Sequence, residues 1–365
     1  MRETPLLSTL RELGANIGEF AGWLTAMDYG NPLDEHMAAR TSVAVFDVSH
    51  MGRYVIRGEN LFEFFQRLLA KDLKKFREGR MSGPALMLNE RGGIKDDVML
   101  YYISDDEWMA VVNAPNIESD REWMLRWARE WGYRISVEDV TLKTALIAVQ
   151  GPEAPKVLRG LGIEGFEDLK ILEFIRTPKV LDGKAILVSR SGWTGEEVRT
   201  HGFEIMADAS LASKIFRKCV ELGAKPAGLI ARDSLRLEMG YVLIGEDISE
   251  DTNPIEARYW MGLSLKKDDF IGRDAVLRAY REGVRRFRYG LRLKKGERRI
   301  PRHGTKVLVD GVEVGEVTSG AYSPYLRRSI GMAYIKPEYA YVGFKASVEI
   351  RGRVLEAKIL DFPLI

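Results

Sequence analysis

The pattern of apolar residues changes near residue 280, and this change limits the folds open to the chain. Before it, stretches with helical spacing alternate with short apolar runs that are typical of strands. After it, short apolar runs separated by glycine or proline turns cover residues 289–293, 306–309, 312–318, 329–334 and 346–350. Strands at this spacing are typical of a small all-β barrel. The sequence therefore predicts an α+β part followed by a barrel.

Two similar α+β units are predicted before residue 280. The first has helices at residues 59–78 and 117–132, with strands at 53–57, 85–88, 98–103 and 108–113. The second begins near Thr144, with strands at 145–149, 185–190 and 203–207 and helices at 154–158 and 212–222. This order is typical of helices packed on antiparallel sheets. A cleft between two such units would suit a ligand.

Size and composition exclude several classes of protein. The 365 residues are too many for one ordinary core, and 55 basic against 53 acidic side chains leave a net charge of +2. A dedicated nucleic-acid binder usually has a larger basic excess. The single cysteine, Cys219, excludes an intrachain disulfide, and none of the four histidines has a metal-ligand spacing. Without a signal peptide or a membrane-spanning stretch, a soluble, cytoplasmic, metal-free protein is expected.

The most informative polar residues are the neighbours Asp96 and Asp97. They follow a turn that contains Gly92 and Gly93, which we expect to supply the positive φ angles of a hairpin. Successive strand residues point to opposite faces, so one carboxylate can point inward. A carboxylate in apolar surroundings must be paired, hydrogen-bonded or used on a ligand. The alternative is that the two aspartates are solvated turn residues or charges at the edge of a strand.

Three further polar positions lie in apolar surroundings. Glu204 begins a predicted strand and could accept two parallel hydrogen bonds from an amino-substituted ring; the alternative is an outward-facing carboxylate. Arg232 could donate to a ligand, or could join a salt-bridge cluster in which Asp233 pairs with Arg236 three residues later. For His50, a satisfied core residue is the simpler interpretation.

Together these segments resemble the T-protein (aminomethyltransferase) family of the glycine cleavage system. The segment Asp47-Val48-Ser49-His50-Met51-Gly52 matches the family pattern. Further matches lie on both sides of this segment, and all of them occur in family order. They are at residues 20–23, 35–40, 88–93, 96–97, 112–114, 150–152, 189–192, 231–233, 253–254, 270–272 and 317–320. So many ordered matches are far more specific than any single one.

The resemblance implies a three-domain cloverleaf around a central folate channel. Two ferredoxin-like α+β domains would comprise residues 1–47 with 139–235, and residues 48–138 with 236–280. Residues 281–365 would form a distorted β-barrel. The implied activity is tetrahydrofolate-dependent: a one-carbon unit passes from the aminomethyl-lipoyl arm of H-protein to tetrahydrofolate, and ammonia is released.

The resemblance also assigns residues and partners. Asp97 would be catalytic, and the folate-binding residues would be Glu204, Arg232, Tyr101, Trp193, Met51 and Asn113. The expected co-substrate is tetrahydrofolate or a related reduced pterin. The expected partners are lipoylated H-protein and the other components of the system, with a homodimer as one candidate assembly and with neither nucleic acid nor membrane. The basic residues 294–299, with Arg302, are either a solvated loop or a dock for an acidic lipoyl carrier.

The chain departs from the family pattern at several expected folate contacts. Pro84, Ile171 and Leu172 replace tyrosines, and Trp193 replaces another. The segment between Glu196 and Glu204 is four residues longer than in the family pattern. The chain also stops before a tail that carries a ligand contact in relatives. One alternative is therefore a folate-dependent demethylase or another one-carbon transferase on the same fold. A second is a non-enzymatic folate-binding assembly factor, although Cys219 does not match the cysteine motif of such relatives.

Overall fold

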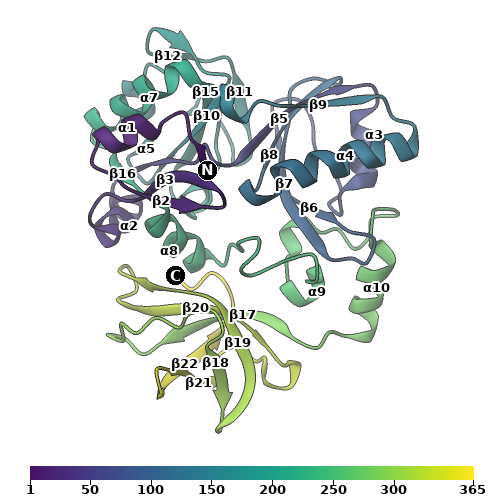
Figure 1. The fold of residues 1–365 in the computed structure, drawn as a ribbon, viewed down its shortest axis with the longest axis vertical. Coiled ribbons are helices and arrows are strands. Elements are labelled where there is room, and N and C mark those ends of the chain that lie inside the picture. Colours follow the sequence, from purple (N-terminus) through teal and green to yellow (C-terminus); the bar gives the residue numbers. More distant parts are fainter. The chain divides into compact units, whose positions relative to one another are not determined.

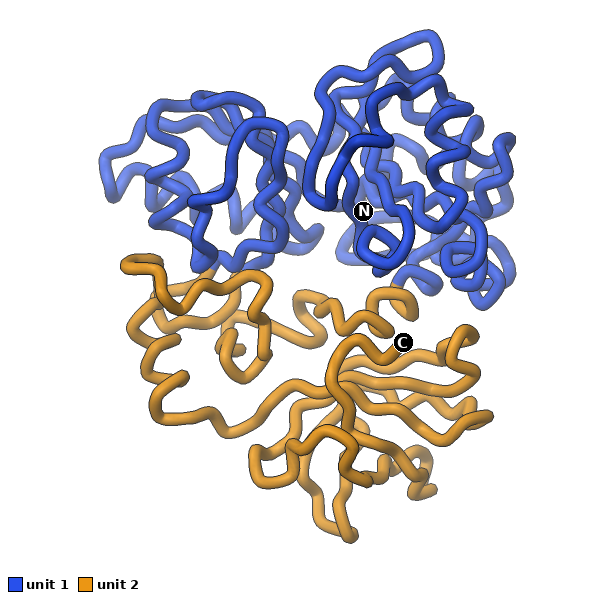
Figure 2. Tube along the Cα trace, turned by 180° about the vertical axis from the view of Figure 1, so that it is seen from behind, with its two compact units in different colours: residues 1–87, 96–232 blue, residues 88–95, 233–365 orange.

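The computed structural model describes residues 1–365, which divide into two compact units (Figure 2). The first unit comprises residues 1–87 and 96–232, and the second comprises residues 88–95 and 233–365. The predicted class is confirmed, because the first unit combines helices with sheets and the second contains a closed barrel. The three domain boundaries stay a prediction.

A six-stranded sheet forms one part of the first unit. Its strands, in spatial order, are β11 (Phe174–Arg176), β14 (Leu187–Ser189), β15 (Gly202–Asp208), β10 (Thr144–Gln150), β4 (Ala44–Asp47) and β16 (Lys225–Ala227). Helices α5 (Ala154–Gly160) and α7 (Ala209–Glu221) cover one face (Figure 1). Phe203, Ile205 and Ala207 point into that helix-covered core. Because strand residues alternate, Glu204 and Met206 point to the opposite face.

A five-stranded sheet forms another part of this unit. Its strands, in spatial order, are β6 (Met81–Leu88), β7 (Ile94–Tyr102), β8 (Glu107–Val112), β5 (Gly52–Gly58) and β9 (Ile135–Asp139). Helices α3 (Leu61–Leu68) and α4 (Ile117–Trp131) accompany it. The prediction for α4 is confirmed: Glu118 and Asp120 lie in its first turn, and Gly132 ends it with φ of 77°.

The predicted helix at residues 59–78 is wrong beyond Leu68. Leu69 is extended, with ψ of 148°, and forms a bridge with Met87, while the Ala70 N–H donates to the Leu86 carbonyl. Pairing with β6 therefore overrides the helical spacing of the side chains. The predicted strand at 185–190 is also shorter, because β14 begins at Leu187.

Smaller elements complete the first unit. The strands β1 (Arg2–Glu3), β3 (Trp23–Asp28) and β2 (Asn16–Phe20) make a three-stranded sheet, and β12 (Lys179–Val180) pairs with β13 (Gly183–Lys184). The further helices are α1 (Leu7–Glu12), α2 (Pro32–Thr41), α6 (Glu196–Arg199) and α8 (Leu229–Met239), of which α8 continues into the second unit.

The barrel of the second unit has six antiparallel strands. They are β17 (Phe287–Leu293), β20 (Arg328–Ile335), β19 (Val312–Ser323), β18 (Lys306–Val309), β21 (Lys345–Ile350) and β22 (Arg353–Leu360), and β22 closes on β17. Alternate residues such as Leu291 and Leu293 fill its interior. Helices α9 (Pro254–Ala257) and α10 (Arg273–Glu282) precede it. No helix of the chain is long and apolar enough to cross a membrane.

Candidate functional site

Asp96 and Asp97 are both buried, at 0% and 6% exposure, so the solvated-turn alternative is wrong. Asp96 accepts from the Asn113 backbone N–H through Oδ2 (3.0 Å) and from the Asn113 side-chain amide through Oδ1 (2.5 Å). The same amide donates to Asp97 Oδ1 at 2.6 Å. Asn113 thus fixes both carboxylates, and Asp96 ties the end of β8 to β7.

The turn before these strands uses its two glycines differently. Only Gly92 has a positive φ, of 78°, so the prediction of positive φ at both glycines is wrong. At Gly93 a side chain is excluded instead, because a Cβ there would lie 1.7 Å from the Glu250 carbonyl oxygen. The Asn89 amide donates to that carbonyl oxygen at 3.0 Å, which holds the turn against residue 250.

A buried arginine shapes the segment between β4 and β5. The Arg53 guanidinium donates to the carbonyl oxygens of Ser49 (3.0 Å) and Met51 and to the Thr144 hydroxyl (2.7 Å). These bonds fix the backbone around His50 and Met51. Gly52, the first residue of β5, pairs with Val112, the last residue of β8. Two predicted site residues, Met51 and Asn113, therefore directly adjoin this pair of strand ends.

Glu204 belongs to a chain of hydrogen bonds. Its carboxylate accepts from the Ser191 hydroxyl at 2.6 Å, and Ser191 contacts the Ser189 hydroxyl at 2.8 Å. Burial and the neighbouring Glu204 charge raise the pKa of Tyr101 well above its usual value, and the Ser189 side chain opposes that shift. Burial also raises the pKa of Glu204. At 4% exposure, Glu204 is not the outward-facing carboxylate of the alternative.

The four extra residues before Glu204 do not displace it from the sheet. Part of the insertion forms α6, where Glu196 makes a buried ion pair with Arg40 at 2.6 Å. Glu204 still pairs with Ser189 on one side and with Ala148 on the other. The strand register therefore fixes its position independently of the insertion.

Arg232 lies in the first turns of α8 and carries an unsatisfied donor. Its buried Nη1 atom has no hydrogen-bond partner in the protein. Burial lowers the pKa of the guanidinium, and the nearby charge of Glu204 opposes that shift. The predicted salt-bridge cluster forms without Arg232: Arg236 donates to Asp233 at 2.8 Å and to Asp247 at 2.6 Å. A buried donor without a partner requires an explanation, and an acceptor on a ligand would supply one.

The half-buried Trp193 lies in the loop between β14 and α6. Gln150 holds this loop, since its amide donates to the Ser191 carbonyl at 3.1 Å and its carbonyl accepts from Thr194 at 2.7 Å. A Cβ at Gly192 would lie 2.1 Å from Gln150 Oε1, which explains the glycine before Trp193. Contact between Trp193 and a ligand stays a prediction.

Two positions where the family pattern has tyrosines lie close together. The Lys71 ammonium donates to the Pro84 carbonyl at 3.0 Å. A Cβ at Gly83 would lie 3.0 Å from Lys71 Nζ and 2.9 Å from a methyl group of Leu172. Burial lowers the Lys71 pKa to about 8. Lys71 thus brings a polar group to this corner, whereas Ile171 is exposed.

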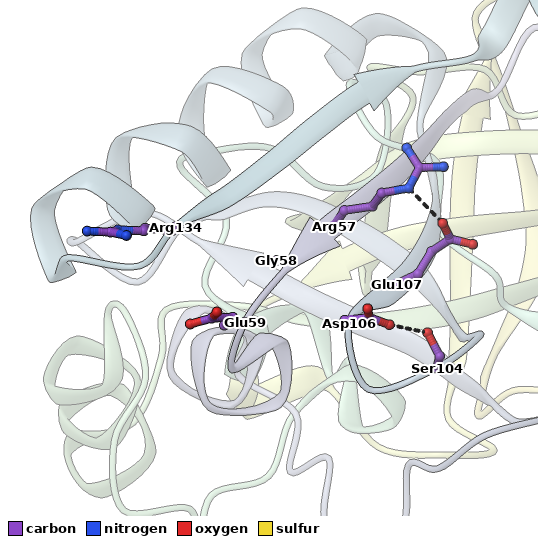
Figure 3. Close-up of a pocket in the computed structure, with 7 residues that line it drawn as sticks. All are labelled: Arg57, Gly58, Glu59, Ser104, Asp106, Glu107 and Arg134. Carbon is purple, nitrogen blue, oxygen red and sulfur yellow. Dashed lines mark hydrogen bonds and ion pairs between the residues drawn. The ribbon is translucent and has the colours of Figure 1, made fainter.

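A polar depression of about 520 Å³ lies at the other end of the five-stranded sheet (Figure 3). Its lining includes Arg57, Glu107 and Arg134. Arg57 pairs with Glu107 in the register that pairs Gly52 with Val112, so the strands separate this depression from Asn113. Two of its charged groups already bind one another, in the 2.7 Å Arg57–Glu107 ion pair.

The arrangement brings most predicted site residues together. Asp97 and Tyr101 lie four residues apart in β7, so their side chains share a face. Asn113 binds Asp97, and the charge of Glu204 acts on both Tyr101 and Arg232. Ser189 and Ser191 lie in a segment that matches the family pattern, but their contacts with Glu204 were not predicted, and Lys71 was missed. No group of three or more His, Cys, Asp or Glu side chains could hold a metal ion. The site offers acid–base groups and directed hydrogen bonds.

Comparison with known proteins extends over nearly the whole chain. A family model described as "GCVT N-terminal domain" matches residues 6–267, and one described as "Glycine cleavage T-protein C-terminal barrel domain" matches residues 286–365. A "Probable aminomethyltransferase" of Aeropyrum pernix is 43% identical, covering 97% of this chain and 95% of its own. An "Aminomethyltransferase" of Thermus thermophilus is 40% identical, covering 100% and 99%.

A solved structure agrees with these sequence matches. The crystal structure of glycine cleavage system aminomethyltransferase T from Bartonella henselae matches with a TM-score of 0.89 and 31% identity, covering 100% of this chain and 98% of the other. The matches include both the α+β part and the barrel. The chain therefore belongs to the glycine cleavage T-protein family of aminomethyltransferases.

Proposed function

We propose that the protein transfers a one-carbon unit from the aminomethyl-lipoyl arm of H-protein to tetrahydrofolate. The observation that carries the proposal is the Asp97 carboxylate, buried and held by Asn113 on the strand face that also carries Tyr101. In a member of this family, a carboxylate held in this way is suited to orient a substrate nitrogen and to assist proton movement.

The residues present fit a reduced pterin. A pterin ring presents an amino group and ring N–H groups beside a carbonyl oxygen. The Glu204 carboxylate suits the N–H edge, and the unsatisfied Nη1 of Arg232 suits an acceptor. Glu204 and Arg232 are near enough for each charge to shift the pKa of the other. We propose these two residues as the ring-binding pair, with Tyr101, Trp193, Met51 and Asn113 around them.

The chemistry balances without a redox partner. The carbon loses its bonds to the amine nitrogen and the lipoyl sulfur and gains bonds to two tetrahydrofolate nitrogens, giving the 5,10-methylene derivative. The two protons displaced from these nitrogens leave on ammonia and on the lipoyl thiol. Asp97 is proposed to orient one nitrogen and to move its proton, which is worth roughly 10²–10⁴-fold in rate.

Ammonia release from aminomethyl-loaded H-protein tests the proposal. With tetrahydrofolate present, we expect equal amounts of ammonia and methylenetetrahydrofolate. Without it, ammonia release should be much slower, and H-protein lacking its lipoyl arm should give neither product. If ammonia release from the loaded carrier did not depend on tetrahydrofolate, the proposal would fail.

A demethylase on the same fold is the second candidate. The observation that favours it is the corner where Pro84 and Leu172 replace tyrosines and Lys71 adds an ammonium group. Such a change could serve a different donor or pterin. Incubation with tetrahydrofolate and a small N-methylated amine separates the two candidates, because only the demethylase would consume that donor.

A basic cluster on the second unit is the proposed dock for the carrier. It consists of the exposed side chains Lys294, Lys295, Arg298, Arg299, Arg302 and Arg327. The Gly296 N–H donates to the Arg327 carbonyl at 3.0 Å, so two separate loops contribute to the cluster. Within residues 294–302 only Glu297 is acidic. Such a concentration of positive charge, in a chain whose net charge is only +2, suits the docking of an acidic lipoyl carrier.

A further inference from the structure

His50 is fully buried but not satisfied, so its interpretation as a satisfied core residue is wrong. The residue is 2% exposed, and its Nδ1 atom has no hydrogen-bond partner in the protein. Nearly all buried side-chain nitrogens in folded proteins have a partner. A buried imidazole nitrogen that lacks one lowers stability, so a reason for its presence must be sought outside the apolar core.

The surroundings hold the imidazole in this position. Arg53 fixes the carbonyls on both sides of His50, those of Ser49 and Met51. The Phe20 ring packs edge-on against the imidazole, with ring centres 5.4 Å apart and planes at 78°. Ring and backbone are therefore both fixed, as is required of a preorganised binding group.

His50 is neutral throughout the working pH range. Burial, with help from the charges of Arg232 and Arg53, lowers its pKa to about 3. A neutral imidazole has one nitrogen that donates and one that accepts. Nδ1 can therefore bind either kind of polar group, depending on the tautomer that the ligand selects.

Two neighbours connect His50 with the proposed site. The Arg232 charge affects His50, and Arg232 Nη1 is also a buried nitrogen without a hydrogen-bond partner in the protein. His50 also lies two residues before Gly52, which pairs with Val112, the residue before Asn113. Asn113 in turn binds Asp97 at 2.6 Å. The Arg232 charge thus links the imidazole to the proposed ring-binding residue, and the backbone of its segment leads to the strand end beside the proposed catalytic carboxylate.

We infer that His50 is a ligand-binding residue, whose Nδ1 hydrogen-bonds the polar edge of the pterin co-substrate beside Arg232. This inference rests on the proposed function. Arg232 supplies a donor and His50 supplies the second hydrogen bond, so the pair would fix the ring in its plane. Two bonds from fixed groups orient a ring, whereas one leaves it free to rotate.

Three variants separate this role from a structural one. Asparagine at position 50 keeps a polar atom near the place of Nδ1, glutamine places it near Nε2, and leucine removes it. We expect His50→Leu to weaken tetrahydrofolate binding about 10–30-fold in calorimetry. His50→Gln should be similarly weak, and His50→Asn should bind within about threefold of wild type.

Thermal unfolding without ligand gives the second measurement. His50→Leu removes an unsatisfied polar atom, so its melting temperature should equal or exceed that of wild type, by up to roughly 4 °C. A loss of binding together with a gain in stability is typical of a residue kept for function. A purely structural role of His50 in the core instead predicts that His50→Leu binds tetrahydrofolate normally and has a lower melting temperature than wild type.

The inference would be overturned if His50→Leu and His50→Gln bound tetrahydrofolate as tightly as wild type. Should His50→Leu fail to fold, the comparison of His50→Gln with His50→Asn still decides, because equal affinities would contradict it. If wild type itself bound no tetrahydrofolate, the proposed function would fail. Glu204→Gln, which alters the proposed site elsewhere, is the positive control for weakened binding.

Discussion

The two neighbouring aspartates differ in what their oxygens do. Asp96 uses both oxygens as acceptors, from the backbone and the side chain of Asn113, and it also accepts from the Asp97 N–H at 2.8 Å. The Asn113 amide contacts Asp97 through Oδ1. Asp96 therefore belongs to the structure of the sheet, and Asp97 is the carboxylate proposed for catalysis.

Isosteric amides at these two positions should separate stability from activity. In Asp96→Asn the new NH₂ group faces an N–H donor, so we expect a loss of about 2–3 kcal/mol in stability. In Asp97→Asn the remaining oxygen can still accept from Asn113, so the loss should stay below about 1 kcal/mol. Thermal unfolding of the two variants checks this order, and the reverse order would contradict the assigned roles.

Glu204 predicts a pH dependence of co-substrate binding. Burial raises its pKa above the usual value, and the proposed contact requires the carboxylate as an acceptor. Protonation puts a donor in its place, so affinity for tetrahydrofolate should fall as pH falls through that raised pKa. Titration calorimetry of wild type against Glu204→Gln from pH 4.5 to 8 isolates this effect. A constant ratio of the two affinities would exclude it.

Sequence reasoning found the residues whose type and motif are informative. Asp97, Glu204 and Arg232 were predicted because charged side chains stand in apolar segments or match the family pattern. The unsatisfied nitrogen of His50 and the Ser189–Ser191 contact were not predicted, because they depend on tertiary neighbours. Burial of a histidine can be predicted from its flanking residues, but the lack of a partner cannot.

Among the elements, the hairpin turn at residues 89–93 is the most tightly constrained. Gly93 has no room for a side chain beside the Glu250 carbonyl, and its N–H donates to Asn89 Oδ1 at 2.9 Å. The sequence predicted the turn and its glycines. It could not predict that Gly92 is needed for its positive φ angle whereas Gly93 is needed because the backbone of Glu250 approaches closely. Residue 250 is distant in sequence, so this contact is not visible from the turn itself.

Substitution of Gly93 tests this constraint. Gly93→Ala requires the backbone to move, so we expect a loss of about 2–4 kcal/mol in stability. Gly162→Ala is the matched control, since Gly162 has φ of 75° but nothing within 4 Å of a Cβ, and it should lose about 1 kcal/mol. Equal melting temperatures for the two variants would show that the turn tolerates a side chain.

Other elements show where side-chain spacing misleads. The helical spacing of residues 59–78 was correct only as far as Leu68, because the following residues pair with β6. Strand β22 (Arg353–Leu360) was missed, although it closes the barrel on β17. Its burial pattern alternates only from Leu355 on, since its first residues are exposed. The barrel itself was predicted because its other strands alternate clearly.

For the whole molecule, charge is distributed unevenly although the total is small. The chain carries +2, yet six cations gather in the basic cluster of the second unit. Composition alone therefore argued against a dedicated nucleic-acid binder but gave no information about a local dock. The family was recognised from the order of its motifs, and the matches over residues 6–267 and 286–365 confirm it.

Charge reversal tests the dock. Lys294→Glu with Arg298→Glu should raise KM for loaded H-protein about tenfold at low salt, with kcat nearly unchanged, and should flatten the dependence on ionic strength. Lys179→Glu with Lys184→Glu reverses the same charge on exposed residues of the first unit and is the control. Equal effects of the two pairs would argue for general electrostatics instead of a specific surface.

The rate of one-carbon transfer in Asp97→Asn tests the central claim most directly. In a single turnover with aminomethyl-loaded H-protein and saturating tetrahydrofolate, methylenetetrahydrofolate should form roughly 10²–10⁴-fold more slowly than with wild type. The melting temperature of the variant should stay near that of wild type. A rate within about threefold of wild type would contradict the assignment of Asp97 as the catalytic residue.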